Sequence, residues 1–431
     1  MMIGSQNTLL PNGLRVVTAR MPHVESVSIG VWVAAGGRCE PQKWSGISHF
    51  IEHLLFKGTR KRSARAISQA IEGRGGDINA FTQEESTCYY ARVAVEHTWS
   101  ALDVLLDMYL QPLFAMDDVR KERDVVIEEI MMYRDQPQQL VDEMLSESLW
   151  CDHALGRPLT GSPDTVKRLG RKDLISYRAQ HYIPANTVIA FAGKVDHESC
   201  VESVRAHFPD VAKKGPRSFA PVGRHVSQKA VCLKEKDSEQ AHVAMGFRLF
   251  GRHDERRYVL KMLSVILGEN MSSRLFQVVR ERYGLAYAVH SGVHLFDDTG
   301  ALVVSVGLER ERLERAMCLI SREIRRLKVT LVGASELKRA RDYAIGQLRL
   351  GLEGTTSQMM WVGEHFISHG RLITPEESMA ALTAVTAEDI RSLAQDVILA
   401  DRLSLAMILP GVTPRLENDL VEIMAGIGGA R

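Results

Sequence analysis

Apolar residues recur along the chain with two different spacings, which predict strands and helices in a repeated order. A continuous apolar run, SVSIGVWVAA at residues 26–35, is typical of a buried strand. Apolar positions three and four apart over residues 96–110 instead predict an amphipathic helix. The first part of the chain thus has a predicted strand at 26–35, a helix around His49 and a second helix at 67–72. A strand at 88–95 and a helix at 96–110 follow.

The second part of the chain repeats this order, which indicates a divergent internal repeat. Its elements are predicted at residues 242–250, 258–267, 273–282, 286–293, 301–308 and 309–327. Each part then ends in a further helix and strand, at 174–182 and 187–193 or at 387–398 and 403–409. We therefore expect an α+β fold of two homologous halves, each built of two similar units with helices packed on a mainly antiparallel sheet.

A polar segment separates the two predicted halves. Residues 211–227 hold Pro216 and Pro221 and follow neither the strand period nor the helix period, which is typical of a linker. We therefore expect a first half over residues 1–210 and a second half over residues 228–431, joined by this linker.

One motif in the first half carries recognisable chemistry. The sequence GISHFIEHLLFKGT at residues 46–59 holds His49, Glu52 and His53 in the pattern H-x-x-E-H. On a helix, two histidines four residues apart lie on one face and can together bind one Zn²⁺. Glu52 points near the same face, where it is better placed to take a proton from a water on the metal than to be a ligand.

Zinc in a catalytic site needs a third protein ligand and keeps one position open for water. The helix predicted at residues 120–133 offers carboxylates for this purpose. Glu122 and Glu129 are seven residues apart, which is two turns, so they share a face. We expect Glu129 to be the third ligand and Glu122 to orient one of the histidines, with Zn²⁺ as the cofactor.

The composition narrows the class of protein. The 431 residues include 54 Lys+Arg and 53 Asp+Glu, a net charge of +1, which does not favour a nucleic-acid partner. No apolar run approaches the roughly 20 residues that span a bilayer, and residues 1–20 lack the pattern of a signal peptide. The six cysteines lie far apart, as is typical of reduced thiols. We therefore expect no membrane partner and a cytoplasmic location, or the mitochondrial matrix if a transit peptide has been removed.

The motifs resemble those of the pitrilysin/insulysin family of inverted zinc peptidases, and most closely the branch of the mitochondrial processing peptidase catalytic subunit and its bacterial relatives. The interval from His53 to Glu129 (129 − 53 = 76 positions) matches the family's spacing to its third ligand. Further matching segments extend over nearly the whole chain: LPNGLRVV at 10–17, GGDINAFT at 75–82, ERDVVIEE at 122–129, SSRLF at 272–276 and RERYGLAY at 280–287.

The resemblance implies a role for each matching residue. It makes His49, His53 and Glu129 the zinc ligands, Glu52 the general base and Glu122 a supporting acid. It places Asn79 and Ala80 on an edge strand that pairs with an extended substrate through backbone hydrogen bonds. It also assigns Arg280 and Tyr287 to a pair that reaches the substrate near the scissile bond, where both are suitable donors to a carbonyl oxygen.

The second half has no H-x-x-E-H and reads GENMSSRLF at the corresponding place, residues 268–276. The resemblance therefore implies an inactive half that closes over the active one and encloses a chamber. The expected activity is that of a zinc metalloendopeptidase that hydrolyses short or unfolded peptides or presequence-like segments. The chain could act as a homodimer or as a heterodimer with a related chain.

Two other functions remain open at this point. The first is that of a non-catalytic structural or partner subunit in a processing-peptidase-like complex; the complete ligand set argues against it, because such subunits usually lose ligands. The second is that of a zinc hydrolase acting on non-peptide substrates; the matches at the edge strand and at Arg280 and Tyr287 argue against it.

Overall fold

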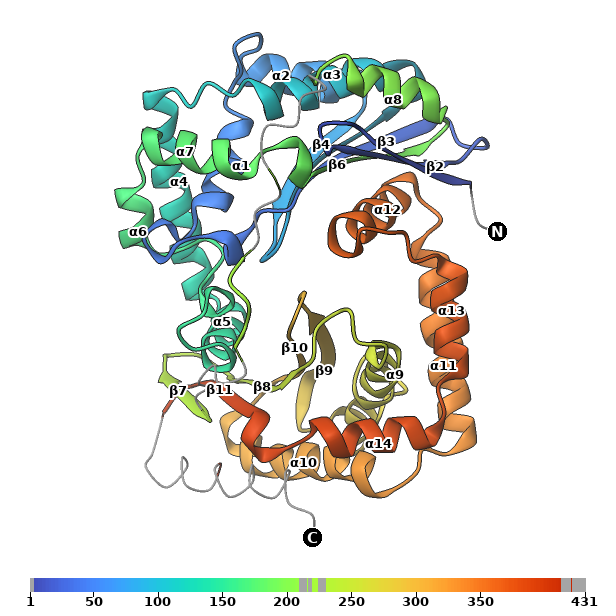
Figure 1. Cartoon of the computed structure of the whole chain (residues 1–431). Helices are drawn as coiled ribbons and strands as arrows, with labels where there is room; N and C mark the ends of the chain where they lie inside the picture. The colour runs from blue at the N-terminus through green and yellow to red at the C-terminus, as the bar shows by residue number, and fades with distance from the viewer. Residues whose placement is uncertain (1–3, 209–214, 216–218, 224–229, 412–419, 421–431) are drawn as a thin grey trace. The chain divides into compact units, whose positions relative to one another are not determined.

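The computed structural model divides the chain into two compact units. It describes residues 4–208, 215, 219–223, 230–411 and 420 (Figure 1). The first unit comprises Met1–Met131, Arg157–Ala220 and Arg349–Pro375, and the second unit comprises Met132–Gly156, Pro221–Leu348 and Glu376–Arg431. The units therefore differ from the predicted contiguous halves, because each takes in a segment from the other half. Most of the predicted linker, 211–227, lies outside the described residues.

The first unit is built on a six-stranded mixed sheet with the order β1-β2-β6-β3-β5-β4. The strand bounds are β1 Ser5–Leu9, β2 Arg15–Arg20, β3 Ser26–Val33, β4 Asp77–Thr82, β5 Thr87–Ala94 and β6 Thr187–Gly193. All neighbouring strands are antiparallel except β2 and β6, which run parallel. Strand β4 pairs with β5 alone and forms one edge of the sheet.

Helices cover both faces of this sheet. One face packs on helices from the same part of the chain, through alternate residues such as Val27, Ile29 and Val31 of β3. The bounds of the helices in this part are α1 Ile47–Leu55, α2 Ala64–Ile71, α3 Thr98–Leu110, α4 Met116–Asp135, α6 Pro163–Arg168, α7 Arg171–His181 and α8 His197–Arg205. The opposite face, with Trp32 at its centre, packs on α12, Thr355–His369, from the other half of the sequence. This alternation follows from the two-residue period of a strand.

The second unit has a five-stranded sheet with the order β7-β11-β8-β10-β9. The bounds are β7 Val231–Glu235, β8 Ala241–Leu249, β9 Ala286–Leu295, β10 Gly300–Leu308 and β11 Leu403–Leu409. One face packs on a large core that includes residues of α9 Arg257–Leu267, α10 Leu313–Val329, α11 Ala334–Gly351 and α14 Ala387–Val397. The other face packs on α5, Pro137–Leu149, from the first half of the sequence. Helix α13 spans Pro375–Ala384.

The α+β class and the two similar halves agree with the sequence prediction. Each predicted strand and helix has a counterpart whose ends lie within a few residues of the predicted ones. For example, the helix expected from residue 309 begins at Leu313. The segment predicted as a helix at 273–282 contains a π-helix at Phe276–Arg282. Pattern analysis did not identify β1, β2, β4, β7, α5, α6, α8 or α11–α13, and only the family resemblance indicated β4. Within the described part of the chain, no helix is both long enough and apolar enough to cross a membrane.

Candidate metal centre

Helix α1 carries the H-x-x-E-H motif, and its apolar side packs into the core of the first unit. Phe50, Ile51, Leu54 and Leu55 are buried in the core of the first unit. The helix begins after Gly46, whose φ of 91° lies in the left-handed region. A Cβ on Gly46 would lie 2.5 Å from the carbonyl oxygen of Thr160, so only glycine fits this close approach.

The structure brings the three predicted ligands together. Nε2 of His49 lies 3.6 Å from Oε2 of Glu129, and Nε2 of His53 lies 3.4 Å from the same oxygen. One ligand atom from each residue lies within 4.8 Å of the other two, and no other such group of three occurs in the described part of the chain. Ligands at zinc–nitrogen distances of 2.0–2.1 Å on a tetrahedron are roughly 3.3 Å apart. The donor set and its spacing therefore fit a zinc ion held by two imidazoles and one carboxylate.

Glu122 contacts His53 and lies two helical turns before Glu129 on α4. Its Oε2 lies 3.3 Å from Nδ1 of His53, and its Oε1 pairs with Nζ of Lys57 at 2.8 Å. Burial alone would lower the pKa of His53, but the carboxylates of Glu129 and Glu122 outweigh burial and raise it. Glu122 thus holds the ring nitrogen opposite the ligand atom, which is the usual partner of a metal-binding histidine. Lys57 was not identified from the sequence.

The carboxyl group of Glu52 contacts the edge strand β4. The hydroxyl of Thr82, at the end of β4, donates a 2.5 Å hydrogen bond to Oε2 of Glu52. Burial raises the pKa of Glu52, while this hydrogen bond acts in the opposite direction. A carboxylate whose pKa is raised holds a proton more strongly than an exposed glutamate does, which suits a group that accepts a proton and later releases it.

The two histidines have different surroundings. Burial, and then the neighbouring His53, lower the pKa of His49 to about 4. His49 is therefore neutral at physiological pH, the state that binds a metal. Its Nδ1 is buried and has no hydrogen-bond partner within the described residues. The ring of His49 thus has no counterpart to the Glu122 contact of His53.

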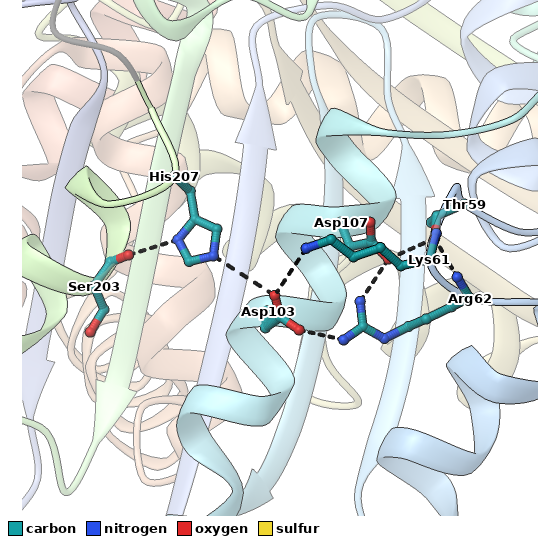
Figure 2. A network of polar contacts seen from close by, with 7 residues as sticks. All are labelled: Thr59, Lys61, Arg62, Asp103, Asp107, Ser203 and His207. Carbon is teal, nitrogen blue, oxygen red and sulfur yellow. Dashed lines mark hydrogen bonds and ion pairs between the residues drawn. The ribbon is translucent and has the colours of Figure 1, made fainter.

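A polar network anchors the loop that follows α1 (Figure 2). The hydroxyl of Thr59 donates to Oδ2 of Asp107 at 2.6 Å, and Arg62 pairs with the same oxygen at 2.6 Å and with Asp103. Asp103 also faces Lys61 at 3.9 Å and His207 at 3.8 Å. Because Asp103 and Asp107 belong to α3, the network joins the end of the H-x-x-E-H segment to a second helix of the unit. Neither the strand period nor the helix period of the sequence predicts these contacts.

The predicted substrate residues of the first half lie on β4. Asn79 and Ala80 pair with Tyr90 and Tyr89 of β5. The amide of Ala80 donates to its neighbour's side chain, Oδ1 of Asn79, at 2.8 Å. Because β4 is an edge strand, one side of its backbone has no strand partner in the sheet.

Arg280 and Tyr287 belong to the second unit and contact each other. Cζ of Arg280 lies 5.0 Å from the ring centre of Tyr287 and 4.7 Å from that of Phe276. The side chain of Tyr287, in the edge strand β9, is 78% exposed. The guanidinium therefore lies within cation–π distance of two aromatic rings.

Comparisons with known proteins place these residues in a family context. Residues 15–163 match the family described as insulinase (peptidase family M16), and residues 168–343 match the peptidase M16 inactive domain. An uncharacterized zinc protease of Mycobacterium tuberculosis (strain H37Rv) is 39% identical over 427 residues, which cover 98% of this chain and 97% of that protein. The uncharacterized zinc protease YmxG of Bacillus subtilis is 38% identical over 399 residues, 93% of this chain and 97% of that protein.

The fold also resembles that of a solved protease structure. The crystal structure of a protease from Helicobacter pylori matches with a TM-score of 0.87 at 19% identity and covers 95% of this chain and 100% of that chain. At this identity the match supports the fold alone.

Proposed function

The chain belongs to the M16 (insulinase) family of peptidases, and from this premise we propose that it is a zinc-dependent endopeptidase that cleaves short or unfolded peptide segments. The observation that carries the proposal is the convergence of His49, His53 and Glu129 on one point, with the carboxyl group of Glu52 on the same helix. This is the donor set of a hydrolytic zinc site and not of a closed structural one, because it leaves a coordination position open.

His49, His53 and Glu129 would hold the metal. When bound, zinc supplies Lewis acidity, which polarises the scissile carbonyl group and lowers the pKa of water. The carboxylate of Glu122 keeps the ring of His53 in one orientation, and Lys57 holds that carboxylate from its other oxygen.

Glu52 is the general base of the proposed reaction. Its carboxylate takes one proton from the attacking water as the new carbon–oxygen bond forms. It then gives this proton to the amide nitrogen as the carbon–nitrogen bond breaks. Burial keeps the pKa of Glu52 above that of an exposed glutamate, which suits a group that must hold the proton between the two steps. The hydroxyl of Thr82 orients the carboxylate.

The substrate would bind as an added strand. Edge strand β4, which carries Asn79 and Ala80, has one side of its backbone without a strand partner and would offer that side to an extended segment, but not to a folded domain, whose backbone groups are already paired. Arg280 and Tyr287 would donate hydrogen bonds to substrate carbonyl oxygens, a role that rests on the resemblance of residues 280–287 to the family.

A direct test is to measure zinc content and peptide cleavage on the same purified chain. We expect about one zinc per chain and cleavage of a mixture of unstructured peptides, with loss of cleavage when a chelator removes the metal and recovery when zinc is restored. A chain that binds zinc but cleaves no peptide would contradict the proposal and favour the non-catalytic partner. Cleavage that survives complete removal of the metal would contradict it as well.

A further inference from the structure

The side chain of Glu40 lies at the beginning of the helix that carries the metal-binding histidines. Its Oε2 accepts a 2.7 Å hydrogen bond from the amide of Gly46, and its Oε1 accepts a 2.8 Å bond from the amide of Ser48. Glu40 is 5% exposed, so these bonds form away from water. Both oxygens of one buried carboxylate are thus used on the first turn of α1.

Helix α1 has no local residue that could do the same. The first amides of a helix lack intrahelical partners, and a serine, threonine, asparagine or aspartate at the N-cap usually binds one of them. Here the N-cap is Gly46, which has no side chain and makes no cap of its own. The close approach to Thr160 excludes a side chain at this position, so the cap must come from elsewhere in the chain.

Other contacts fix Glu40 and the same turn. A guanidinium nitrogen of Arg157 donates to the backbone oxygen of Glu40 at 2.5 Å. The hydroxyl groups of Ser48 and the buried Tyr177 lie 2.9 Å apart. The first turn of α1 is therefore held from outside by several buried polar contacts, of which the Glu40 carboxylate makes the two that reach the helix amides.

This turn includes His49, the third residue of α1. His53 is oriented by Glu122 at its Nδ1, but Nδ1 of His49 has no partner among the residues that the structure describes. The position of the His49 ring therefore depends on the backbone that carries it and on its packing. Any shift or fraying of the first turn would move Nε2 of His49 relative to Glu129.

We propose that Glu40 is a positioning residue of the metal centre: its carboxylate holds the first turn of α1 so that His49 faces His53 and Glu129. This inference rests on the proposed function for the metal itself. It adds that a residue outside the H-x-x-E-H motif, acting through two backbone amides, sets the geometry of one ligand.

The test compares Glu40→Gln with Asp173→Asn. Glutamine keeps the size of Glu40, but only one of its end atoms can accept, and its amide would face a helix N–H donor against donor. Asp173 is a matched control because its Oδ2 also accepts from the amide of a glycine N-cap, Gly170, at the start of α7. Zinc affinity of the full chain is measured by chelator competition, and ligand geometry by the visible absorption of the Co²⁺-substituted protein.

We expect Glu40→Gln to weaken zinc binding by about tenfold or more and to change the Co²⁺ spectrum, since groups that orient ligands are worth about 10–100-fold in affinity. At saturating zinc its kcat should fall while KM stays constant. Asp173→Asn should stay within about twofold of the wild type in zinc affinity, with an unchanged spectrum. Glu40→Asp, which can reach one amide but not both, should give an intermediate affinity, and it decides the matter if Glu40→Gln does not fold.

Wild-type zinc affinity and an unchanged Co²⁺ spectrum in Glu40→Gln would overturn the inference and leave the proposed function intact. Equal losses in Glu40→Gln and Asp173→Asn would also overturn it, because the effect would then be a general one on stability. A wild-type chain that binds no zinc would overturn the proposed function, and the inference with it.

Discussion

Helix α1 of the first unit and helix α9 of the second occupy the same place in the two halves, yet of the two only α1 carries candidate metal ligands. Each follows a central strand of its sheet and precedes the edge strand, β4 or β9. A shift of 212 positions (264 − 52 = 212) superimposes their buried faces. Four of the five buried apolar positions of α1 then fall on buried apolar positions of α9: Phe50, Ile51, Leu54 and Leu55 on Met262, Leu263, Ile266 and Leu267. The fifth, Ile47, falls on Val259, which is partly buried.

The same shift shows what replaced the metal-binding residues. His49, Glu52 and His53 correspond to Lys261, Ser264 and Val265 of α9. The segment at residues 268–276, which was expected from the sequence to be the corresponding place, lies after the end of this helix, so that prediction was wrong. Lys261 forms an ion pair with Glu269 at 2.5 Å, and Val265 is fully buried. The second half has therefore kept the residues that pack α9 on its sheet and lost those that could bind a metal.

The contact between helix and edge strand differs in the same way. In the first unit the hydroxyl of Thr82 donates to the carboxyl group of Glu52. In the second unit the hydroxyl of Ser291 donates to the backbone oxygen of Ser264 at 2.9 Å, and the amide of Ser291 donates to the oxygen of Gly268 at 3.2 Å. The hydroxyl hydrogen bond is thus present in both units, although a serine stands in place of the proposed base in the second. The separate bond to Gly268 occupies an amide of the edge strand that an added strand would need. The residues that pack the helix and those proposed to act in catalysis are thus separable within one architecture.

The largest effect is expected from Glu52→Gln. The amide cannot take a proton, so peptide cleavage should fall by about 10²–10⁴-fold, whereas zinc content should stay near that of the wild type because no ligand is lost. Ser264→Ala, at the corresponding position of α9, should leave cleavage unchanged. Turnover of Glu52→Gln near the wild-type rate, measured on metal-loaded protein, would show that the base lies elsewhere.

Loss of a ligand should be distinguishable from loss of its neighbour. Glu129→Gln should weaken zinc binding by more than the roughly 100-fold upper value for groups that only orient ligands. Glu128→Gln should bind zinc normally, because Glu128 is exposed and points about 100° away around the helix. The measurement is chelator competition on both variants. Loss of zinc in Glu128→Gln alone would shift the assignment on α4 by one residue.

The register of the metal centre could be predicted because it is local to helices. Spacings of four and seven residues put His49 over His53 and Glu122 below Glu129 on any regular helix. The pairing of the two helices was expected from the carboxylates of Glu122 and Glu129 on one helix face, and the family's spacing from His53 to Glu129 supported it. Glu40 and Lys57 could not be predicted, since Glu40 follows a three-residue 3₁₀ helix and Lys57 follows the end of α1, where no period applies.

The sequence pattern also could not predict that α12 packs on the sheet of the first unit and α5 on that of the second. Trp32 of β3 is 2% exposed because α12 covers it, and the two segments are more than 300 residues apart in the chain. Hydroxyl groups of Thr355 and Thr356 on α12 lie 3.0 and 3.1 Å from Ser28 Oγ. Periodicity reports which residues of a helix are buried, but not which sheet buries them. A fragment ending at residue 210 would lack α12 and leave this sheet face uncovered.

A smaller effect is expected from the second unit. Tyr287→Phe removes the proposed donor but keeps the ring on which Arg280 stacks, so it should lower kcat by about tenfold, the equivalent of one hydrogen bond, without lowering zinc content. Arg280→Ala should cost at least as much. Cleavage at the wild-type rate in both variants would mean that this pair belongs to the packing of the second unit.

Thr82→Val should change the pH dependence more than the maximal rate. The hydroxyl of Thr82 stabilises the charged form of Glu52 and so lowers its pKa against the larger effect of burial. Without the hydroxyl the pKa of Glu52 rises. Because the base must be deprotonated to act, the acidic limb of the kcat/KM profile should move to higher pH. An acidic limb that stays in place or moves to lower pH would argue that another group controls it.

The smallest effect is expected from Ser291→Ala, the counterpart of that substitution in the second half. The backbone oxygen of Ser264 would still accept from the amide of Gly268 at 2.9 Å, and the hydroxyl of Ser264 would lose only its long 3.3 Å contact with Ser291 Oγ. The variant should therefore lose about 1 kcal/mol of unfolding free energy, the usual net value of one hydrogen bond, as measured by urea denaturation. Its kcat, KM and pH profile should equal those of the wild type. A change in the pH profile would mean that the link between helix and edge strand takes part in catalysis in both halves, and would remove the contrast between α1 and α9.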